Sequence, residues 1–126
     1  MKKLLLTTIL FTSITAFAGS VPIFKITDSD SFLVGHTGWE IQLQNVDVPS
    51  VVNASCSKER ELGLDAIKTL RNILVKADSL NINNYTFNTN FVKTGVDMQV
   101  DGKDIAQTLI DRGLARRYTW NYVGWC

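Results

Sequence analysis

The spacing of apolar residues changes twice along this chain, and that change limits its fold more than any other feature. Apolar and polar residues alternate over residues 39–44 and again over residues 96–100, as in strands that bury one face. Between them, over residues 62–74, apolar residues recur at every third or fourth position, which predicts the longest helix. The chain is therefore expected to combine a sheet with helices.

Shorter signals complete this order. Ser57 is the expected N-cap of the long helix, and a second helix is predicted over residues 104–112, with Gly113 in the left-handed conformation that often follows a helix. Three strands, a helix, two strands and a helix fit a small, partly open β-barrel with helices against it, in a mainly β fold of the α+β class. Segments rich in β-favouring residues supply three further strands, residues 22–27, 31–34 and 80–87, and the alternation at 96–100 belongs to a strand expected over residues 91–100.

Residues 1–18 have the composition of a secretory signal peptide, with a basic start, a short apolar run and small residues at the cleavage site. The run is shorter than the roughly 20 residues that span a bilayer, so no stable membrane anchor is expected. Residues 19–126 would then form one domain, periplasmic or secreted. Because Lys2 and Lys3 leave with the signal, the formal net charge falls from +1 to −1, and any contact with nucleic acid has to be local.

The two cysteines, Cys56 and Cys126, are expected to form a disulfide in an oxidising compartment. A bridge across so long a loop would stabilise the fold by about 4 kcal/mol in the chain-entropy model. The alternative is a pair of free thiols. A zinc site has less support, because two cysteines and His36, the only histidine, do not supply four ligands. His36 falls in a predicted turn between strands, with no visible catalytic partner.

Five short motifs follow one another along the chain: Ile26-Thr27-Asp28-Ser29-Asp30-Ser31-Phe32, Ile41-Gln42-Leu43-Gln44-Asn45-Val46-Asp47-Val48-Pro49-Ser50, Val100-Asp101-Gly102-Lys103-Asp104, Gly113-Leu114-Ala115-Arg116 and Trp125-Cys126. Their order and spacing resemble the thermonuclease (staphylococcal-nuclease-like) family, in particular its short secreted bacterial members. The resemblance covers residues 23–126. It implies a five-stranded oligonucleotide/oligosaccharide-binding (OB) barrel with about three helices, the third short and near the C-terminus. It also implies a calcium-dependent endonuclease that acts on DNA or RNA.

The positions that carry hydrolysis in that family are mostly replaced here. By the resemblance, Gln42 stands at the position of one catalytic arginine, Lys93 at that of the second arginine and Ser50 at that of the glutamate. Gln42 is uncharged, Lys93 lacks the two-pronged guanidinium contact, and Ser50 is no base without an activating group. Because each such loss commonly costs a factor of about 10² to 10⁴ in rate, impaired or absent hydrolysis is expected.

The metal part of the family site is partly kept. The resemblance places Asp30 and Asp47 on calcium-ligand positions, and the backbone carbonyl of Val48 is a third candidate ligand. Calcium prefers such oxygen donors. The alternative is structural, because Asp28 and Asp30 also suit a tight turn and Asp47 also suits a bend before proline.

The C-terminal segment is basic and aromatic. Arg116 and Arg117, with Lys93, are candidate contacts for the phosphates of nucleic acid. The aromatic residues have two possible roles, stacking on unpaired bases or packing the chain end onto the sheet, and packing is favoured for the tryptophans. These aromatic residues are Tyr118, Trp120, Tyr122 and Trp125.

Three functions remain open at this point. The first is a nuclease-like pseudoenzyme that binds single-stranded nucleic acid, a nucleotide or a protein partner. The second is an active calcium-dependent nuclease in which Glu40 or Asp97 takes over the activation of water. The third is a structural or assembly component of a secreted system.

Overall fold

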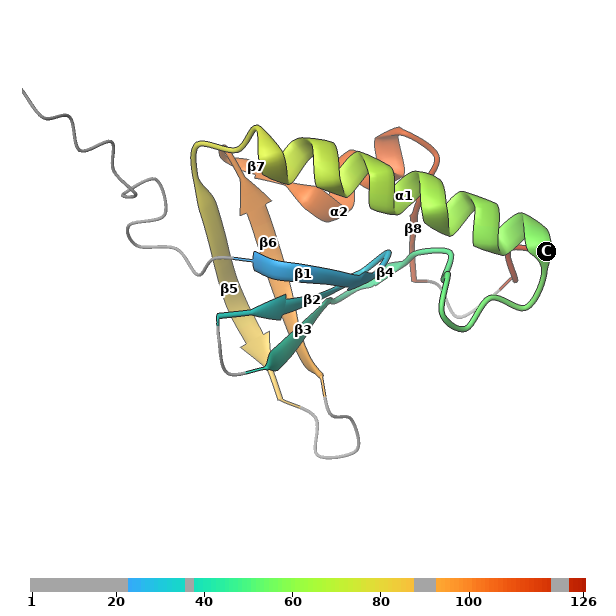
Figure 1. The fold of residues 1–126 in the computed structure, drawn as a ribbon, viewed down its shortest axis with the longest axis horizontal. Coiled ribbons are helices and arrows are strands. Elements are labelled where there is room, and N and C mark those ends of the chain that lie inside the picture. Colours follow the sequence, from blue (N-terminus) through green and yellow to red (C-terminus); the bar gives the residue numbers. More distant parts are fainter. Residues whose placement is uncertain (1–22, 36–37, 88–92, 119–122) are drawn as a thin grey trace, which may run out of the picture.

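The computed structural model describes residues 23–35, 38–87, 93–118 and 123–126. The described part is an α+β fold with more strands than helices (Figure 1). The predicted signal peptide, His36, Trp120 and Tyr122 lie outside the described residues.

One sheet dominates the fold. Its strands follow the order β1-β2-β3-β6-β5, β7 pairs with β6, and β4 and β8 form a separate pair. β3 and β6 are parallel, whereas the other paired strands are antiparallel. The bounds are β1 (Ile23–Asp28), β2 (Ser31–Val34), β3 (Trp39–Leu43), β4 (Val46–Asp47), β5 (Leu80–Thr86), β6 (Thr94–Val100), β7 (Lys103–Asp104) and β8 (Arg116–Arg117).

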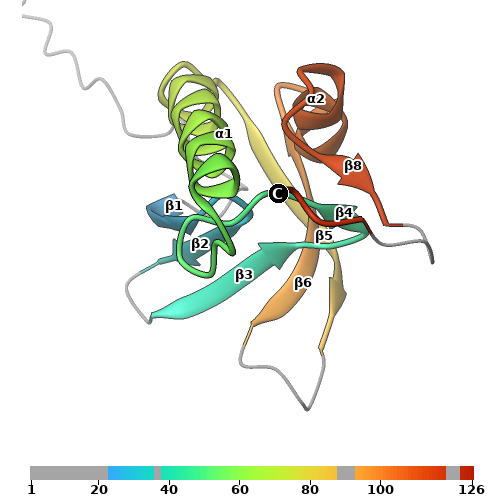
Figure 2. The same cartoon turned by 90° about the vertical axis from the view of Figure 1, so that its right-hand side faces the viewer.

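Two helices, α1 (Ser57–Val75) and α2 (Ile105–Asp111), lie on one side of the sheet (Figure 2). The core fills the space between them and the sheet. The alternation predicted for residues 96–100 is confirmed, since every second residue of β6 is buried. Gly113 has φ +74° after α2, as predicted. The largest fully buried side chains are Phe32, Ile41, Leu70, Met98, Ile105 and Leu109.

The predicted barrel is not closed in the described residues. β1 and β5 end the strand path and do not pair with each other. Ile23 of β1 and Leu80 of β5 instead line a small cavity together with Leu74 and Ala77, at the end of α1. Side chains from the helix region thus lie where strand pairing would close the sheet. The described part of the chain contains two helices, and the predicted third helix is not found in it.

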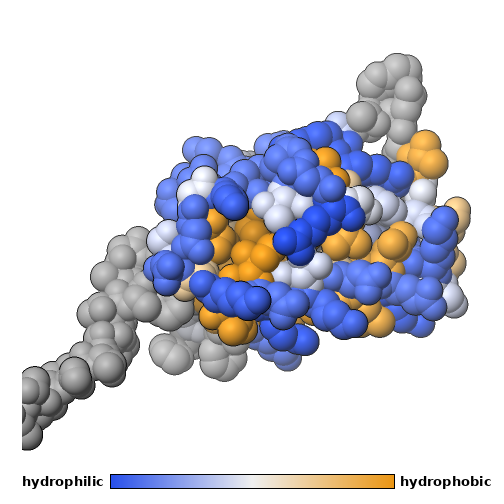
Figure 3. Space-filling model, turned by 90° about the horizontal axis from the view of Figure 1, so that it is seen from above, coloured by the Kyte–Doolittle hydropathy of each residue, from blue (hydrophilic) through white to orange (hydrophobic). Residues whose placement is uncertain are grey.

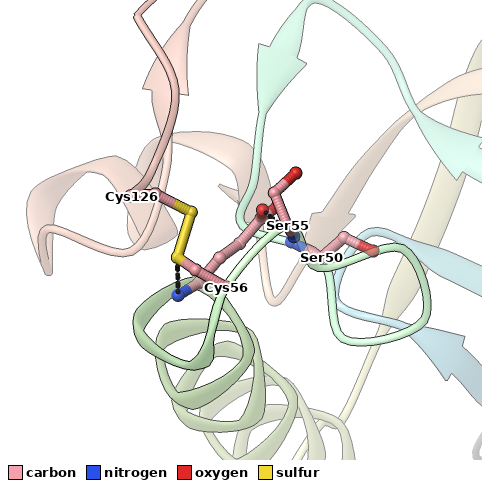
Figure 4. The surroundings of a disulfide bond; sticks show 5 residues. Ser50, Ser55, Cys56 and Cys126 are labelled. Atoms are coloured by element: carbon pink, nitrogen blue, oxygen red, sulfur yellow. Dashed lines mark hydrogen bonds between the residues drawn. A yellow bond between two sulfur atoms is a disulfide. The ribbon is translucent and has the colours of Figure 1, made fainter.

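α1 begins one residue earlier than predicted. Cys56, not Ser57, is the N-cap, and its Sγ accepts a hydrogen bond from the backbone N–H of Glu59 at 3.4 Å (Figure 4). The Glu59 carboxylate turns back and accepts hydrogen bonds from the backbone N–H groups of Ser50 and Ser55. This reciprocal arrangement resembles a capping box, and it ties the helix start to the preceding loop.

The loop before α1 leaves no room for a side chain at position 63, which explains the glycine inside this helix. A Cβ there would stand 2.8 Å from a Val51 methyl group and 2.9 Å from the carbonyl oxygen of Pro49. Glycine usually costs up to about 1 kcal/mol relative to alanine in a helix. Here its missing side chain lets the loop after β4 cross the helix in close contact.

The predicted disulfide between Cys56 and Cys126 is present, with 6.0 Å between the two Cα atoms (Figure 4). It joins the start of α1 to the last residue of the chain. The alternative of two free thiols is therefore wrong.

Polar side chains cover much of the helix-bearing face, with apolar side chains between them (Figure 3). Within the described residues, no helix combines the length and the apolar character needed to cross a membrane.

Candidate functional site

Five polar residues meet on the outer face of the sheet, and we call them the Lys93 cluster: Asp30, Ser31, Glu40, Gln42 and Lys93. Glu40 and Gln42 flank the buried Ile41 on β3, so strand alternation turns both side chains away from the core. Ser31 is the register partner of Gln42, and Lys93 immediately precedes β6. The sheet thus gathers residues from three separate parts of the sequence.

The Asp30 carboxylate is held by two neutral donors. Gln42 Nε2 donates to Oδ2 at 2.9 Å, and the Ser31 hydroxyl donates to Oδ1 at 2.9 Å. Burial raises the pKa of the Asp30 carboxyl, and these two hydrogen bonds offset part of that rise. Gln42 therefore orients Asp30, but it brings no positive charge to the site.

Lys93 supplies the positive charge of the cluster. Its Nζ donates to the Ser31 hydroxyl oxygen at 3.0 Å and lies 3.7 Å from Glu40 Oε2. The Thr27 hydroxyl also donates to Glu40, at 2.7 Å. About a third of the Lys93 side chain is exposed, so the residue is partly open to solvent.

Ser50, predicted at the glutamate position, contacts a different group of residues. Its hydroxyl donates to Asp28 Oδ2 at 2.8 Å and accepts a hydrogen bond from the backbone N–H of Asn53. Asp28 also accepts hydrogen bonds from the backbone N–H groups of Ser29 and Val51. Ser50 and Asp28 thus fix the turn and the loop, in agreement with the structural interpretation of Asp28.

Asp47 and Val48, the other candidate metal ligands, lie in and after β4. Asp47 is buried, and its Oδ2 accepts a hydrogen bond from Arg116 Nε at 3.2 Å. No group of three or more His, Cys, Asp or Glu side chains suited to a metal ion occurs within the described residues. Calcium usually takes six to eight oxygen ligands. With Asp47 paired to arginine and both Asp30 oxygens hydrogen-bonded, this donor set fits calcium poorly.

Arg116 and Arg117 have different surroundings. The Arg116 guanidinium lies over the Trp125 ring and donates to the backbone carbonyl of Val123. Arg117 is more exposed, 3.6 Å from Asp104 Oδ2 and hydrogen-bonded to Gln107. Arg116 therefore holds the chain end, which accords with the packing role favoured for Trp125.

Sequence reasoning missed an aromatic stack formed by Trp39, Tyr85 and Phe87. The ring centroids of Trp39 and Tyr85 are 5.7 Å apart, those of Tyr85 and Phe87 are 6.5 Å apart, and both pairs are nearly parallel. Trp39 Nε1 donates to the Thr94 hydroxyl at 3.1 Å, and Phe87 is 74% exposed. Tyr85 and Phe87 are close in sequence, but Trp39 is far from both, so the stack gave no local signal beyond β-favouring composition.

Asp97, one of the two proposed replacement bases, belongs to another network. It accepts hydrogen bonds from the side-chain amides of Gln44 and Asn84. Glu40, the other one, is part of the Lys93 cluster.

No protein-family model matches this chain, and a search of curated proteins finds no match either.

Proposed function

We propose that this chain is an exported nuclease-like domain of the thermonuclease type, with impaired or absent hydrolysis, which binds single-stranded nucleic acid. The proposed fold is an OB-type barrel, partly open between β1 and β5. Its support is the strand path, with a β1-β2-β3 meander, a helix, and a β5-β6 hairpin whose β6 is parallel to β3.

Weak hydrolysis is supported by what surrounds the replaced positions. Phosphodiester hydrolysis needs an activated water and positive charge at the phosphate. Ser50 is bound to Asp28, and Gln42 offers Asp30 a neutral amide. Glu40 is the carboxylate beside Lys93, but it is already held by Thr27 and by Lys93 itself.

The observation that carries the binding proposal is that Lys93 and the aromatic stack lie at the same end of the sheet. Thr94, which holds the Trp39 ring, directly follows Lys93, so both features lie where β3 and β6 begin. Trp39 and Glu40 face opposite sides of β3. Because the two features face opposite sides, a bound nucleic-acid strand would cross the end of the sheet where β3 and β6 begin. One of its phosphates would contact Lys93, and an unpaired base would stack on Phe87.

The test is the binding of a labelled oligothymidylate to the folded, oxidised protein, measured by fluorescence anisotropy as salt rises. Stacking of one base is worth about 1–3 kcal/mol, so Phe87→Ala should weaken binding roughly 5- to 100-fold. Lys93→Gln should reduce the slope of log K against log salt by about one unit. Lys103→Gln, on the exposed β7 position, is the control and should change the affinity little.

Absence of binding at low salt would overturn this function and direct the search to a protein partner. The hydrolysis part has its own test, in which the oligonucleotide is incubated with calcium and then with a chelator. Calcium-dependent cleavage that is lost in Asp30→Ala would show an active nuclease.

A further inference from the structure

A second polar site lies farther along the outer face of the same sheet. It is a pocket of about 380 Å³ between β5, β6, the turn after β3 and the start of α2. The residues that line it include Asp97, Asp104, Ala106 and Arg117. We call it the amide pocket after five of its side chains: Gln44, Asn45, Asn83, Asn84 and Gln99.

The chemistry of the amide pocket suits a ligand rich in hydroxyl groups. Each amide side chain offers both donors and an acceptor, and a sugar hydroxyl can likewise donate and accept. The described residues that line the pocket include no aromatic ring, and Ala106 is the one apolar side chain among them. A flat aromatic ligand would find no stacking partner in these residues.

The charges favour a neutral ligand. Asp97 and Asp104 contribute two carboxylates and Arg117 one guanidinium, which lies 3.6 Å from Asp104. The excess of one negative charge repels phosphate or carboxylate groups. The amide pocket is therefore a poor site for a nucleotide phosphate.

Two of the amide side chains, those of Gln44 and Asn84, are held in place before any ligand arrives. Gln44 Nε2 donates to the backbone carbonyl of Asn84 at 2.6 Å, and Asn84 Nδ2 donates to Asp97 Oδ2 at 2.8 Å. The buried Asn83 Oδ1 has no hydrogen-bond partner among the described residues. Asn45 and Asn84 have left-handed backbones, with φ of +61° and +55°. Asparagine adopts this conformation more readily than most residues other than glycine, so both residues suit the turns that shape the pocket. Fixed amides reduce the ordering cost of binding.

We propose that the amide pocket binds a neutral saccharide. Ring hydroxyls would accept hydrogen bonds from the side-chain amides of Asn83 and Gln99 and donate to Asp97. Gln44 Nε2, by contrast, already donates to Asn84 and Asp97. This site is separate from the proposed contact of nucleic acid with Lys93, and it holds whether or not that function does.

The experiment titrates the folded, oxidised protein with neutral sugars (glucose, galactose and N-acetylglucosamine) and follows side-chain and backbone amides by NMR. We expect saturable shifts of the pocket amides with at least one of them. Glucuronate, which carries a carboxylate, should bind more weakly. Loss of one hydrogen-bonding amide in Asn83→Ala should weaken binding about three- to tenfold.

Asn81→Ala is the matched control, because Asn81 is an exposed asparagine of the same strand that does not line the pocket. Gln99→Ala serves as a second pocket variant if Asn83→Ala fails to fold. The proposal is overturned if none of the neutral sugars gives saturable shifts at these amides, or if Asn81→Ala weakens binding as much as the pocket variants do. Binding of uridine without binding of sugars would overturn it as well.

Discussion

The guanidinium of Arg116 lies 3.9 Å from the centroid of the Trp125 ring. The same side chain donates from Nε to Asp47, so one residue of β8 holds both β4 and the chain end. The disulfide joins Cys126, the residue after Trp125, to the start of α1. Trp125 and Cys126 are thus attached to the rest of the fold, and Arg116 stabilises the fold more directly than it serves a ligand.

Arg116→Lys should lower the free energy of unfolding by about 1–2 kcal/mol, because lysine keeps the charge but loses the flat contact with Trp125 and the directed bond to Asp47. Arg117→Lys is the matched control on the adjacent, more exposed residue and should change stability by less than about 0.5 kcal/mol. Urea denaturation of both variants measures the difference. Equal losses would contradict the structural role of Arg116.

The double replacement Cys56→Ser/Cys126→Ser should lower the free energy of unfolding by about 2–5 kcal/mol, since the bridge closes a loop with a sequence separation of 70 residues. Thermal unfolding of the double variant and of the oxidised protein measures the change. Addition of a reductant should bring the melting temperature of the unsubstituted protein close to that of the variant. Insensitivity to reductant would show that the bridge stabilises the fold little.

Gly63→Ala should destabilise the protein by about 1–3 kcal/mol, although alanine is the better helix former. The added methyl group would meet the Pro49 carbonyl oxygen at 2.9 Å, and that backbone is held by neighbouring hydrogen bonds. Asn72→Ala, on an exposed position of α1, is the control and should stabilise slightly. A gain in stability from Gly63→Ala would show that the loop moves away at little cost.

The longer elements were predictable because each has a local sequence pattern, whereas the two-residue strands β4, β7 and β8 have none and were missed. The alternation at residues 39–44 and 96–100 and the helical spacing over residues 62–74 depend on neighbours in sequence, and the structure places strands and a helix there. The N-cap of α1 lies one residue before the predicted one, because the sulfur of the disulfide-bonded Cys56 accepts the hydrogen bond that the Ser57 hydroxyl was expected to accept. Helix ends are in general less sharply encoded than helix interiors.

The candidate site was harder to predict because its contacts join distant residues. Trp39 and Thr94, and also Asp47 and Arg116, meet only after β6 has paired with β3 and β8 with β4. Ser50 shows a second difficulty. Its sequence position suggested a place beside the reactive groups, whereas its hydroxyl is bound to Asp28.

Ser50→Glu should therefore destabilise the fold, by about 1–3 kcal/mol, and not restore a catalytic base. Asp28 accepts a hydrogen bond from the Ser50 hydroxyl at 2.8 Å, and Glu59 accepts one from the Ser50 backbone N–H. A new carboxylate at position 50 would therefore lie near two other carboxylates and would lose the hydroxyl donor. Gln42→Arg, beside the Asp30 carboxylate, should be tolerated. Chemical denaturation measures both effects. Calcium-dependent nuclease activity in the folded variant that combines Gln42→Arg with Ser50→Glu would contradict this account of Ser50.

Asp30→Asn should change the dependence of stability on pH. Burial raises the pKa of Asp30 above its ordinary value of 3.8, since desolvation and the nearby Asp28 outweigh the hydrogen bonds and Lys93. The folded state thus binds this proton more tightly than the unfolded state does. The stability that Asp30 contributes is complete below pH 3.8 and is lost as pH rises through the folded-state pKa.

Asparagine stays neutral, and the Gln42 amide can turn to offer its oxygen to it. The variant should therefore gain stability over the unsubstituted protein as pH rises above about 4, and the gain should level off above the folded-state pKa. Urea denaturation across this pH range measures it. Asp65→Asn, on the exposed face of α1, corrects for the change in net charge. A difference that shrinks with rising pH would mean that the Asp30 carboxylate, in its charged form, is stabilised by the Lys93 cluster.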